Sequence, residues 1–259
     1  MAFIPRNVAG PWQGVRRTLA LAAAVAFTAC APAEEEGPSA AELEQFRQEV
    51  TQALEAVRAE LQDLQERISE EAPEEWSHLS TVAETTRDEV MADLQRLTEA
   101  SAEEVKEVRR AAARRLAGLE AEVVQREVNM ADDLETLRMV AEHHLAQLED
   151  NLSEVARRSA EALSREEQAA ESQEDPAQDA LPMQDTDRVT PDRIAEIEDE
   201  IQVLRDWVER VTDLPEEELE EEYQEDFETL RQDVGESMGE ITRKVRALWY
   251  STRWQATVA

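Results

Sequence analysis

The chain has 259 residues, of which 34% are charged and only 4% aromatic, and its formal net charge is −34. Because nucleic-acid binding needs a concentrated basic surface, a chain with 61 acidic and 27 basic residues is a poor candidate for a nucleic-acid partner. Few large apolar side chains are available for a thick core, which favours elongated helices that each bury one narrow stripe.

The first 29 residues have the features of an export signal. Arg6, Arg16 and Arg17 form a positive n-region, and the almost purely apolar run 18–29 matches a signal-peptide h-region. This run of twelve residues is shorter than the ~20 residues that a membrane-spanning helix needs. We therefore expect a signal peptide over residues 1–29 and an exported protein.

The apolar run ends in Phe27-Thr28-Ala29-Cys30, and Cys30 is the only cysteine in the chain. This tetrapeptide resembles the bacterial lipobox, although Phe27 stands where that family usually has leucine. The resemblance implies that Cys30 receives a diacylglyceryl group on its sulfur and becomes the amino terminus after cleavage. It thus implies a lipid-anchored protein of the cell envelope with its body in the periplasm.

Two alternatives to lipidation stay open. Ala31-Pro32-Ala33 also fits the rule for ordinary signal cleavage, which would release a soluble secreted protein, and the apolar run could remain as an uncleaved membrane anchor.

If the protein is lipidated in a Gram-negative organism, the usual sorting rule of bacterial lipoproteins favours the outer membrane, because Ala31 rather than aspartate follows the cysteine. Residues 30–38 are short, acidic and rich in small residues, and so predict a flexible tether.

Residues 39–168 predict a long helical rod. Its first part carries an apolar stripe at steps of three and four residues: Leu43, Phe46, Val50, Leu54, Val57, Leu61, Leu64 and Ile68. Pro73 predicts a break. From residue 75 to 167 there is no proline, and a single helix of that length would measure ~140 Å at ~1.5 Å per residue.

An eleven-residue repeat runs through this long stretch. Leu94, Val105 and Leu116 are spaced by eleven, and parallel series pass through Leu97 and Ser101. This period corresponds to about 3.67 residues per turn, and it predicts nearly straight helices that pack along their length.

The remaining chain predicts an acidic disordered linker over 169–190 and a helical pair over 191–255. Thr190 and Pro191 are typical of a helix start, and a heptad stripe follows: Ile194, Ile197, Ile201, Leu204, Val208 and Val211. After Pro215, a second stripe continues to Leu248, with Gly235 and Gly239 in its middle. The fold class expected is therefore all-α, with extended amphipathic helices in a coiled-coil-like rod, a C-terminal helical hairpin and disordered linkers.

No catalytic, cofactor or metal motif is present in the sequence, which predicts that the protein is not an enzyme. His143 and His144 are adjacent, so on a helix their side chains point about 100° apart and do not favour a shared metal. The acidic cluster Glu216 to Asp226 is typical of a solvated helix face rather than of a calcium loop.

Two basic sets are candidate contact sites. The first is a basic island of Lys106, Arg109, Arg110, Arg114 and Arg115, which either binds an anionic partner or neutralises acids on a packed neighbour. The second lies near the C-terminus and combines cations with aromatics, which suits a membrane interface or, alternatively, aromatic packing: Arg243, Lys244, Arg246, Trp249, Tyr250, Arg253 and Trp254.

These features favour a non-enzymatic envelope lipoprotein that acts as a helical spacer, scaffold or adaptor through coiled-coil packing. Its expected partners are a membrane, through Cys30, and other helices, which belong either to the protein itself, as an oligomer or by packing within one chain, or to an envelope protein. The alternative is a lipid- or membrane-surface-binding protein that uses its eleven-residue amphipathic helices. The acidity of the long stretch and its single lysine argue against that alternative, because surface-bound helices usually carry basic residues along the apolar boundary.

Overall fold

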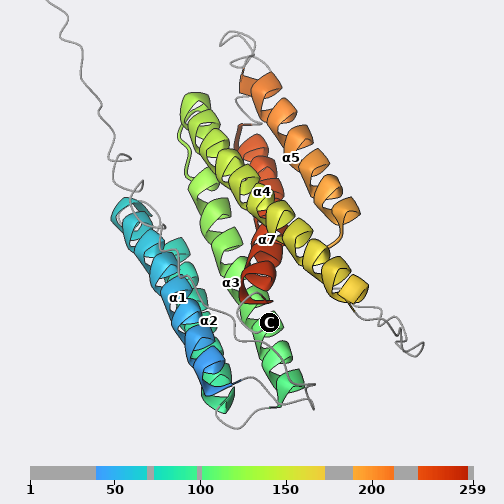
Figure 1. Cartoon of the computed structure of the whole chain (residues 1–259). Coiled ribbons are helices and arrows are strands. Elements are labelled where there is room, and N and C mark those ends of the chain that lie inside the picture. Colours follow the sequence, from blue (N-terminus) through green and yellow to red (C-terminus); the bar gives the residue numbers. More distant parts are fainter. Residues whose placement is uncertain (1–38, 69–72, 98–100, 173–188, 213–226, 256–259) are drawn as a thin grey trace, which may run out of the picture. The chain divides into compact units, whose positions relative to one another are not determined.

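The computed structural model describes residues 39–68, 73–97, 101–172, 189–212 and 227–255. The lipobox residues Phe27, Thr28, Ala29 and Cys30, the tether and the acidic cluster all lie outside these ranges. The described residues form α-helices and no strand (Figure 1), so the all-α prediction is confirmed. The helices are α1 (Ala40–Ile68), α2 (Pro73–Arg96), α3 (Ala102–Asn129), α4 (Leu134–Ser172), α5 (Pro191–Thr212) and α7 (Phe227–Gln255).

Polar side chains fix where several of these helices begin. Ser39 and Glu42 exchange hydrogen bonds at the start of α1, and Ser101 and Glu104 form the same capping box at the start of α3. At the start of α5, the backbone N–H of Arg193 donates to the hydroxyl of Thr190, and Pro191 is the first helical residue. These side chains satisfy backbone groups that no earlier turn can reach.

The proline-free stretch from residue 75 to 167 is not one continuous helix. It is divided between α2, α3 and α4, with breaks on either side of α3. The capping box at Ser101 starts α3, and the turn after Met130 ends it. There Asp133 accepts a hydrogen bond from the N–H of Thr136 at 2.7 Å. At its far end, α4 continues to Ser172, beyond the expected start of the linker.

The eleven-residue series through Leu94 nevertheless marks buried positions, whereas the series through Ser101 begins at an exposed residue. Leu94, Val105 and Leu116 are all buried, although they belong to two different helices. The repeat therefore identifies the residues that face a neighbour, whereas the capping residues decide where the helix axis stops.

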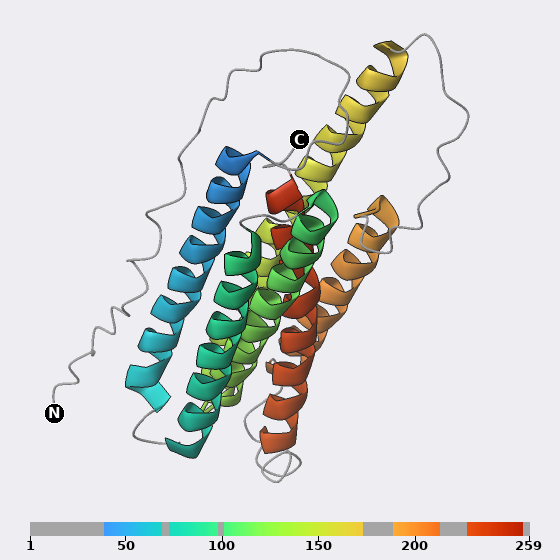
Figure 2. The same ribbon diagram turned by 90° about the horizontal axis from the view of Figure 1, so that it is seen from below.

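Helices that are far apart in sequence pack against one another. α3 lies beside α7 in both ribbon views (Figures 1 and 2), and it also contacts α1, α2 and α4. α5 contacts α4 and α7, but the most extensive neighbour of α7 is α3. The two C-terminal helices are therefore not an isolated hairpin, because each is built into a larger helical assembly.

Three apolar clusters form the core. The largest joins α4, α5 and α7, and it contains the predicted heptad residues Ile194, Ile197, Ile201, Leu204 and Val208. A second joins α1, the end of α2, α3 and the C-terminal turns of α7, and a third lies between α1, α2 and α3. The apolar stripes predicted from the sequence are thus used for packing within the chain.

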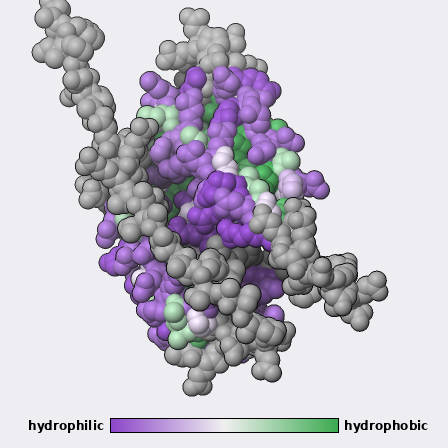
Figure 3. All heavy atoms as spheres, in the orientation of Figure 1, coloured by the Kyte–Doolittle hydropathy of each residue, from purple (hydrophilic) through white to green (hydrophobic). Residues whose placement is uncertain are grey.

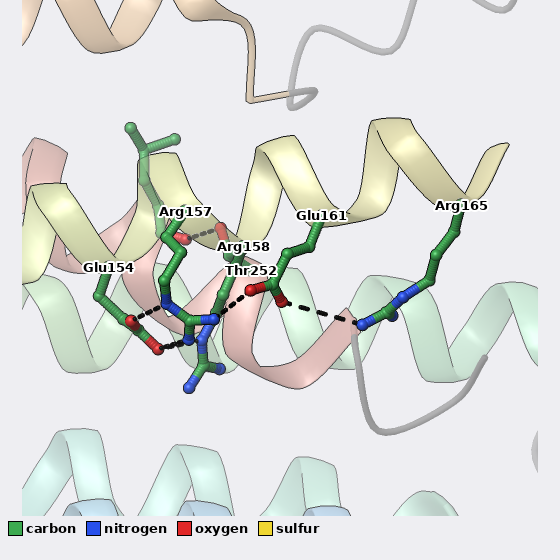
Figure 4. Close-up of polar contacts among 7 residues, drawn as sticks. Glu154, Arg157, Arg158, Glu161, Arg165 and Thr252 are labelled. Carbon is green, nitrogen blue, oxygen red and sulfur yellow. Dashed lines mark hydrogen bonds and ion pairs between the residues drawn. The ribbon is translucent and has the colours of Figure 1, made fainter. Parts of the chain in front are cut away.

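Hydrophilic residues dominate the described surface on the face shown in Figure 3. On α4, Glu154 pairs with Arg157 at 2.7 Å and with Arg158 at 2.6 Å, and Glu161 pairs with Arg157 and Arg165 (Figure 4). Such exposed pairs support the helix by only ~0.3–0.5 kcal/mol each. None of the helices in the described ranges is long and apolar enough to cross a membrane.

Candidate functional site

The seam between α3 and α7 is unusually close because two glycines of α7 face α3. A Cβ atom added at Gly235 would lie 2.4 Å from Oδ1 of Asn129, and one at Gly239 would lie 3.3 Å from the carbonyl oxygen of Ala121. At Gly235 the end of the Asn129 side chain would have to move aside, and at Gly239 the backbone of α3 would have to yield by a few tenths of an ångström. The glycines therefore set how closely the two helices approach.

A buried polar cluster lies further along the same seam. Glu120 of α3 is only 5% exposed. Its Oε1 accepts a hydrogen bond from the Tyr250 hydroxyl at 2.6 Å, and its Oε2 lies 2.7 Å from Nε of Arg246. Burial raises the pKa of Glu120, whereas Arg246 and Tyr250 oppose that rise by stabilising the carboxylate. The cluster thus ties the C-terminal turns of α7 to α3.

Two of the three aromatic residues for which a membrane interface and aromatic packing are the alternatives, Tyr250 and Trp254, lie in the core. Tyr250 and Trp254 are 3% and 1% exposed, and the Trp254 ring meets Phe46 of α1 edge-on with centroids 5.3 Å apart. Membrane contact by Tyr250 and Trp254 is therefore incompatible with this fold, because α1 and α3 enclose both side chains. Trp249 is half-buried, and the guanidinium of Arg253 lies 5.0 Å from its ring centre.

The predicted basic island is divided among three environments. Arg115 pairs with Glu89 at 2.9 Å and with Asp93, both on α2, so here the cation neutralises acids on a packed neighbour. Arg109 is half-buried, with its guanidinium 5.2 Å from the ring centre of Phe46, and burial lowers its pKa. Lys106 is also half-buried and has an interaction partner.

The other two residues of the island, Arg110 and Arg114, meet the second basic set. They lie one helical turn apart on α3, and the packing of α3 on α7 places them beside Arg243 and Lys244. Together they enclose a pocket of about 230 Å³. Its lining consists of Arg110 and Arg114 from α3, Arg193 from α5, and Arg243, Lys244, Ala247, Leu248 and Ser251 from α7. We call this the cationic pocket.

Not all five cations of the cationic pocket are equally available. Nζ of Lys244 lies 2.8 Å from both carboxylate oxygens of Glu200 and 3.0 Å from Glu240, so its charge is already balanced. Arg114 and Arg243 are exposed, and neither makes a hydrogen bond or ion pair with another described residue. These two guanidinium groups can therefore each receive an anionic oxygen pair in bidentate geometry.

The histidines do not extend this site. Nε2 of His144 lies 2.8 Å from Oε2 of Glu127 and is buried, whereas His143 contacts Gln147 at 2.9 Å and His78 is exposed. Within the described ranges, no group of three or more His, Cys, Asp and Glu side chains is arranged to hold a metal ion.

Two important residues were not singled out from the sequence. Arg193 lies in the first turn of α5, where the helix dipole favours acids, so a cation at that position was a signal that could have been noticed. Glu120 is one acid among 61, and no sequence pattern marks it as buried.

Comparison with protein-family models, with curated proteins and with solved structures finds no match for this chain.

Proposed function

We propose that this protein is a lipid-anchored adaptor of the cell envelope whose folded helical body binds an anionic group of an envelope partner. The observation that carries the proposal is the cationic pocket: cations from α3, α5 and α7 surround one cavity in a chain of net charge −34. In so acidic a protein, the exposed guanidinium groups of Arg114 and Arg243, which make no ion pair with another described residue, are available for such a contact. The lipobox resemblance at Cys30 supports the anchor.

The coiled-coil part of the scaffold hypothesis takes a different form in this proposal. The heptad stripe of α5 lies against α4 and α7, so its packing builds the body rather than joining it to another rod. The adaptor function is then assigned to the surface of the body and to the segment that follows Cys30. Neither requires catalysis, and we propose no reaction for the protein.

The alternative of lipid binding through the eleven-residue helices is less well supported. A helix that lies on a membrane must present its apolar stripe to the lipid. Here the stripe residues pack against other helices, and within the described ranges the large apolar side chains that are exposed are scattered: Met91, Met139, Leu163 and Val203. Opening the whole core would be needed to expose a continuous stripe.

The anchor is tested by fatty-acid labelling of the protein in bacterial cells. Cys30→Ala should abolish the label and move the protein into the soluble fraction, because no other thiol exists to carry the lipid. Phe27→Leu serves as the matched control, since it restores the usual lipobox residue and should keep or increase the label. Unchanged labelling of Cys30→Ala would refute the anchor.

The cationic pocket is tested by titrating the unlipidated full chain with tripolyphosphate and with phosphatidylglycerol vesicles. Arg114→Gln with Arg243→Gln should weaken binding about tenfold or more, because each hydrogen bond to a charged group contributes ~1.5–3 kcal/mol. Arg58→Gln with Arg87→Gln removes the same charge from exposed positions on α1 and α2 and should have little effect. Equal losses of affinity in both double variants would mean that the anions bind through the overall charge of the surface and not in the cationic pocket.

A further inference from the structure

A second concave surface lies between α5 and α7, and its chemistry is opposite to that of the cationic pocket. It is a groove of about 920 Å³. The apolar part of its lining, which we call the floor, consists of Val203, Leu204 and Trp207 from α5 and Ile241 from α7. The acidic part, which we call the rim, consists of Glu196, Asp199 and Glu200 on α5 and Asp233, Glu236 and Glu240 on α7, and Ser237 and Lys244 complete the lining. We call this the acid-rimmed groove.

The apolar floor is partly open to solvent. Val203 lies off the heptad stripe of α5 and is 69% exposed, the highest value among the large apolar residues that are exposed in the described ranges. Trp207 is half-buried and packs on one side against the core. A large apolar side chain held this far out of the core costs hydration free energy, and covering it would recover that cost.

The acids of the rim are mostly unneutralised. Lys244 is taken up by Glu200 and Glu240. Glu196, Asp199 and Asp233 are exposed and make no ion pair with another described residue. Several carboxylates facing one groove repel one another, so a cationic occupant would be stabilised by all of them at once.

From this arrangement we propose that the acid-rimmed groove docks a basic amphipathic helix of another protein. Such a helix would place apolar residues at i, i+3 or i+4, and i+7 on Val203 and Trp207, with lysine or arginine along both flanks to meet the rim. The floor would then determine the spacing of the apolar residues on the docked helix. The acidic rim would require basic residues on both sides of that apolar face. The inference does not rest on anion binding by the cationic pocket, although Lys244 lines both surfaces.

Charge argues against the two acidic connecting segments of this chain as occupants. The segment 213–226, which joins α5 to α7, contains nine acidic and no basic residues, and the segment 173–188 contains five acidic and one basic residue. A second copy brings a net charge of −34. Anionic lipid headgroups are repelled by the same rim. A basic helix from a different protein is the occupant whose charge complements the groove.

The test is a binding titration of the full chain with a labelled synthetic peptide of about five helical turns (~18 residues) that has leucines at helical spacing and lysine flanks. We expect saturable binding to one site, with affinity that falls on adding salt. A scrambled peptide of identical composition should bind at least tenfold more weakly, because it cannot align its leucines along one face. Equal binding of the two peptides would overturn the proposal, since it would reflect only the net charge.

Matched variants locate the site. Val203→Asp should weaken binding of the amphipathic peptide tenfold or more, whereas Met139→Asp, at an apolar residue of α4 that is 56% exposed, should not. Asp199→Lys with Glu236→Lys should weaken binding in the same way, and Glu55→Lys with Glu84→Lys, at exposed positions outside the groove, should weaken it far less. Circular dichroism of each variant checks that the helices are intact.

Two further outcomes would assign the groove to a different occupant and so overturn the proposal. The first is a protein that self-associates in sedimentation and becomes monomeric on Val203→Asp, which would make the groove a contact between copies. The second is peptide binding that appears only after Arg6, Arg16 and Arg17 are replaced by glutamate, which would place the basic amino-terminal segment of the chain in the groove.

Discussion

The two buried sides of α7 are built in different ways. Towards α4 and α5, α7 presents a stripe of large apolar residues that includes Val234, Met238 and Ile241. Towards α3, it presents Gly235 and Gly239 and then the buried pair of Arg246 with Glu120. The first side follows the helical period and is visible in the sequence. The second side consists of small residues and charged residues, and their role can be recognised only when the residues that they contact on α3 are known.

This difference explains how the fold is specified. Apolar stripes can pack on many neighbours, so they favour burial without choosing a partner. A glycine that lets one particular backbone approach closely, and a buried carboxylate that must pair with one particular guanidinium, select the neighbouring helix far more strictly. The α3 side of α7 is therefore where we expect the arrangement of the helices to be decided.

The largest effect is expected for Arg246→Met. Removing this cation leaves the buried carboxylate of Glu120 uncompensated, which should destabilise the protein by about 3–5 kcal/mol at neutral pH. Adding Glu120→Leu should recover most of that loss, because both charges are then gone. The free energies of unfolding in urea give this comparison directly, and a loss below about 1 kcal/mol in the single variant would mean that the cluster is not buried.

The pH dependence of that loss has a definite sign. Burial already raises the pKa of Glu120 above its usual value of 4.5, and Arg246 lowers it. Removing Arg246 raises the folded-state pKa further, so the penalty is full above this pKa and disappears as the pH falls towards the unfolded value. The difference in unfolding free energy between Arg246→Met and the parent should shrink as the pH falls from neutral to about pH 5. Glu60 is a further carboxylate whose charge interacts with Glu120 and Arg246. A difference that does not change with pH would contradict the assignment.

On the apolar side of α7, Ile201→Ala should cost about 2–5 kcal/mol, the range for truncating a buried aliphatic side chain. Ile201 of α5 is 2% exposed within the cluster that joins α4, α5 and α7. Val203→Ala, two residues away on the exposed side, should change stability by less than about 0.5 kcal/mol. The thermal unfolding midpoint should therefore fall much more for Ile201→Ala than for Val203→Ala. Similar changes would show that α5 does not pack on α4 and α7 through its heptad stripe.

Gly235→Ala tests the close approach of α3 and α7. The new Cβ would displace the side-chain amide of Asn129 and lie 3.3 Å from the carbonyl oxygen of Gln125, and this overpacking should cost about 1–3 kcal/mol. Gly118→Ala is the matched control, because a Cβ there meets nothing within 4 Å and alanine favours helix by ~0.5–1 kcal/mol. Opposite signs for the two substitutions in denaturant unfolding are the expected result, and the same sign would argue against the tight seam.

The smallest effect is expected at the start of α3. Ser101→Ala removes the side chain that caps the helix and should cost about 0.5–2 kcal/mol. Ser77→Ala, an exposed serine inside α2, should cost little or nothing. Equal effects in chemical denaturation would mean that the capping box does not define the break between α2 and α3.

Much of the local structure could be predicted from the sequence. The stripes of α1 and α5 indicated burial of residues such as Phe46, Val50 and Ile197, and all of these are buried. The breaks around α3 were missed because the eleven-residue interval resumes beyond each of them, with a phase change of one residue on α4, although Ser101 with Glu104 is a capping-box pattern. Periodicity records which face is apolar, and it carries no information about where a helix stops.

The candidate site could be predicted only in part. Arg110, Arg114, Arg243 and Lys244 were recognised as basic candidates, but in two separate sets more than 120 residues apart. Their meeting in one pocket depends on α3 packing on α7, which is a long-range contact that glycines and a buried acid select. Tyr250 and Trp254 were weighed as a membrane interface because basic residues with aromatics suit a surface, whereas the fold encloses both rings.

A designed disulfide tests the packing of α3 on α7 most directly. A Cβ at position 239 would lie 3.4 Å from Cβ of Gln125, close to the ~3.5–4.5 Å that a disulfide requires. In a Cys30→Ala chain, Gln125→Cys with Gly239→Cys should therefore form an intramolecular disulfide rapidly under mild oxidation. Gln125→Cys with Glu236→Cys, on the exposed side of α7, should form it far more slowly. No crosslink in the first pair, or equal rates in both, would contradict the account.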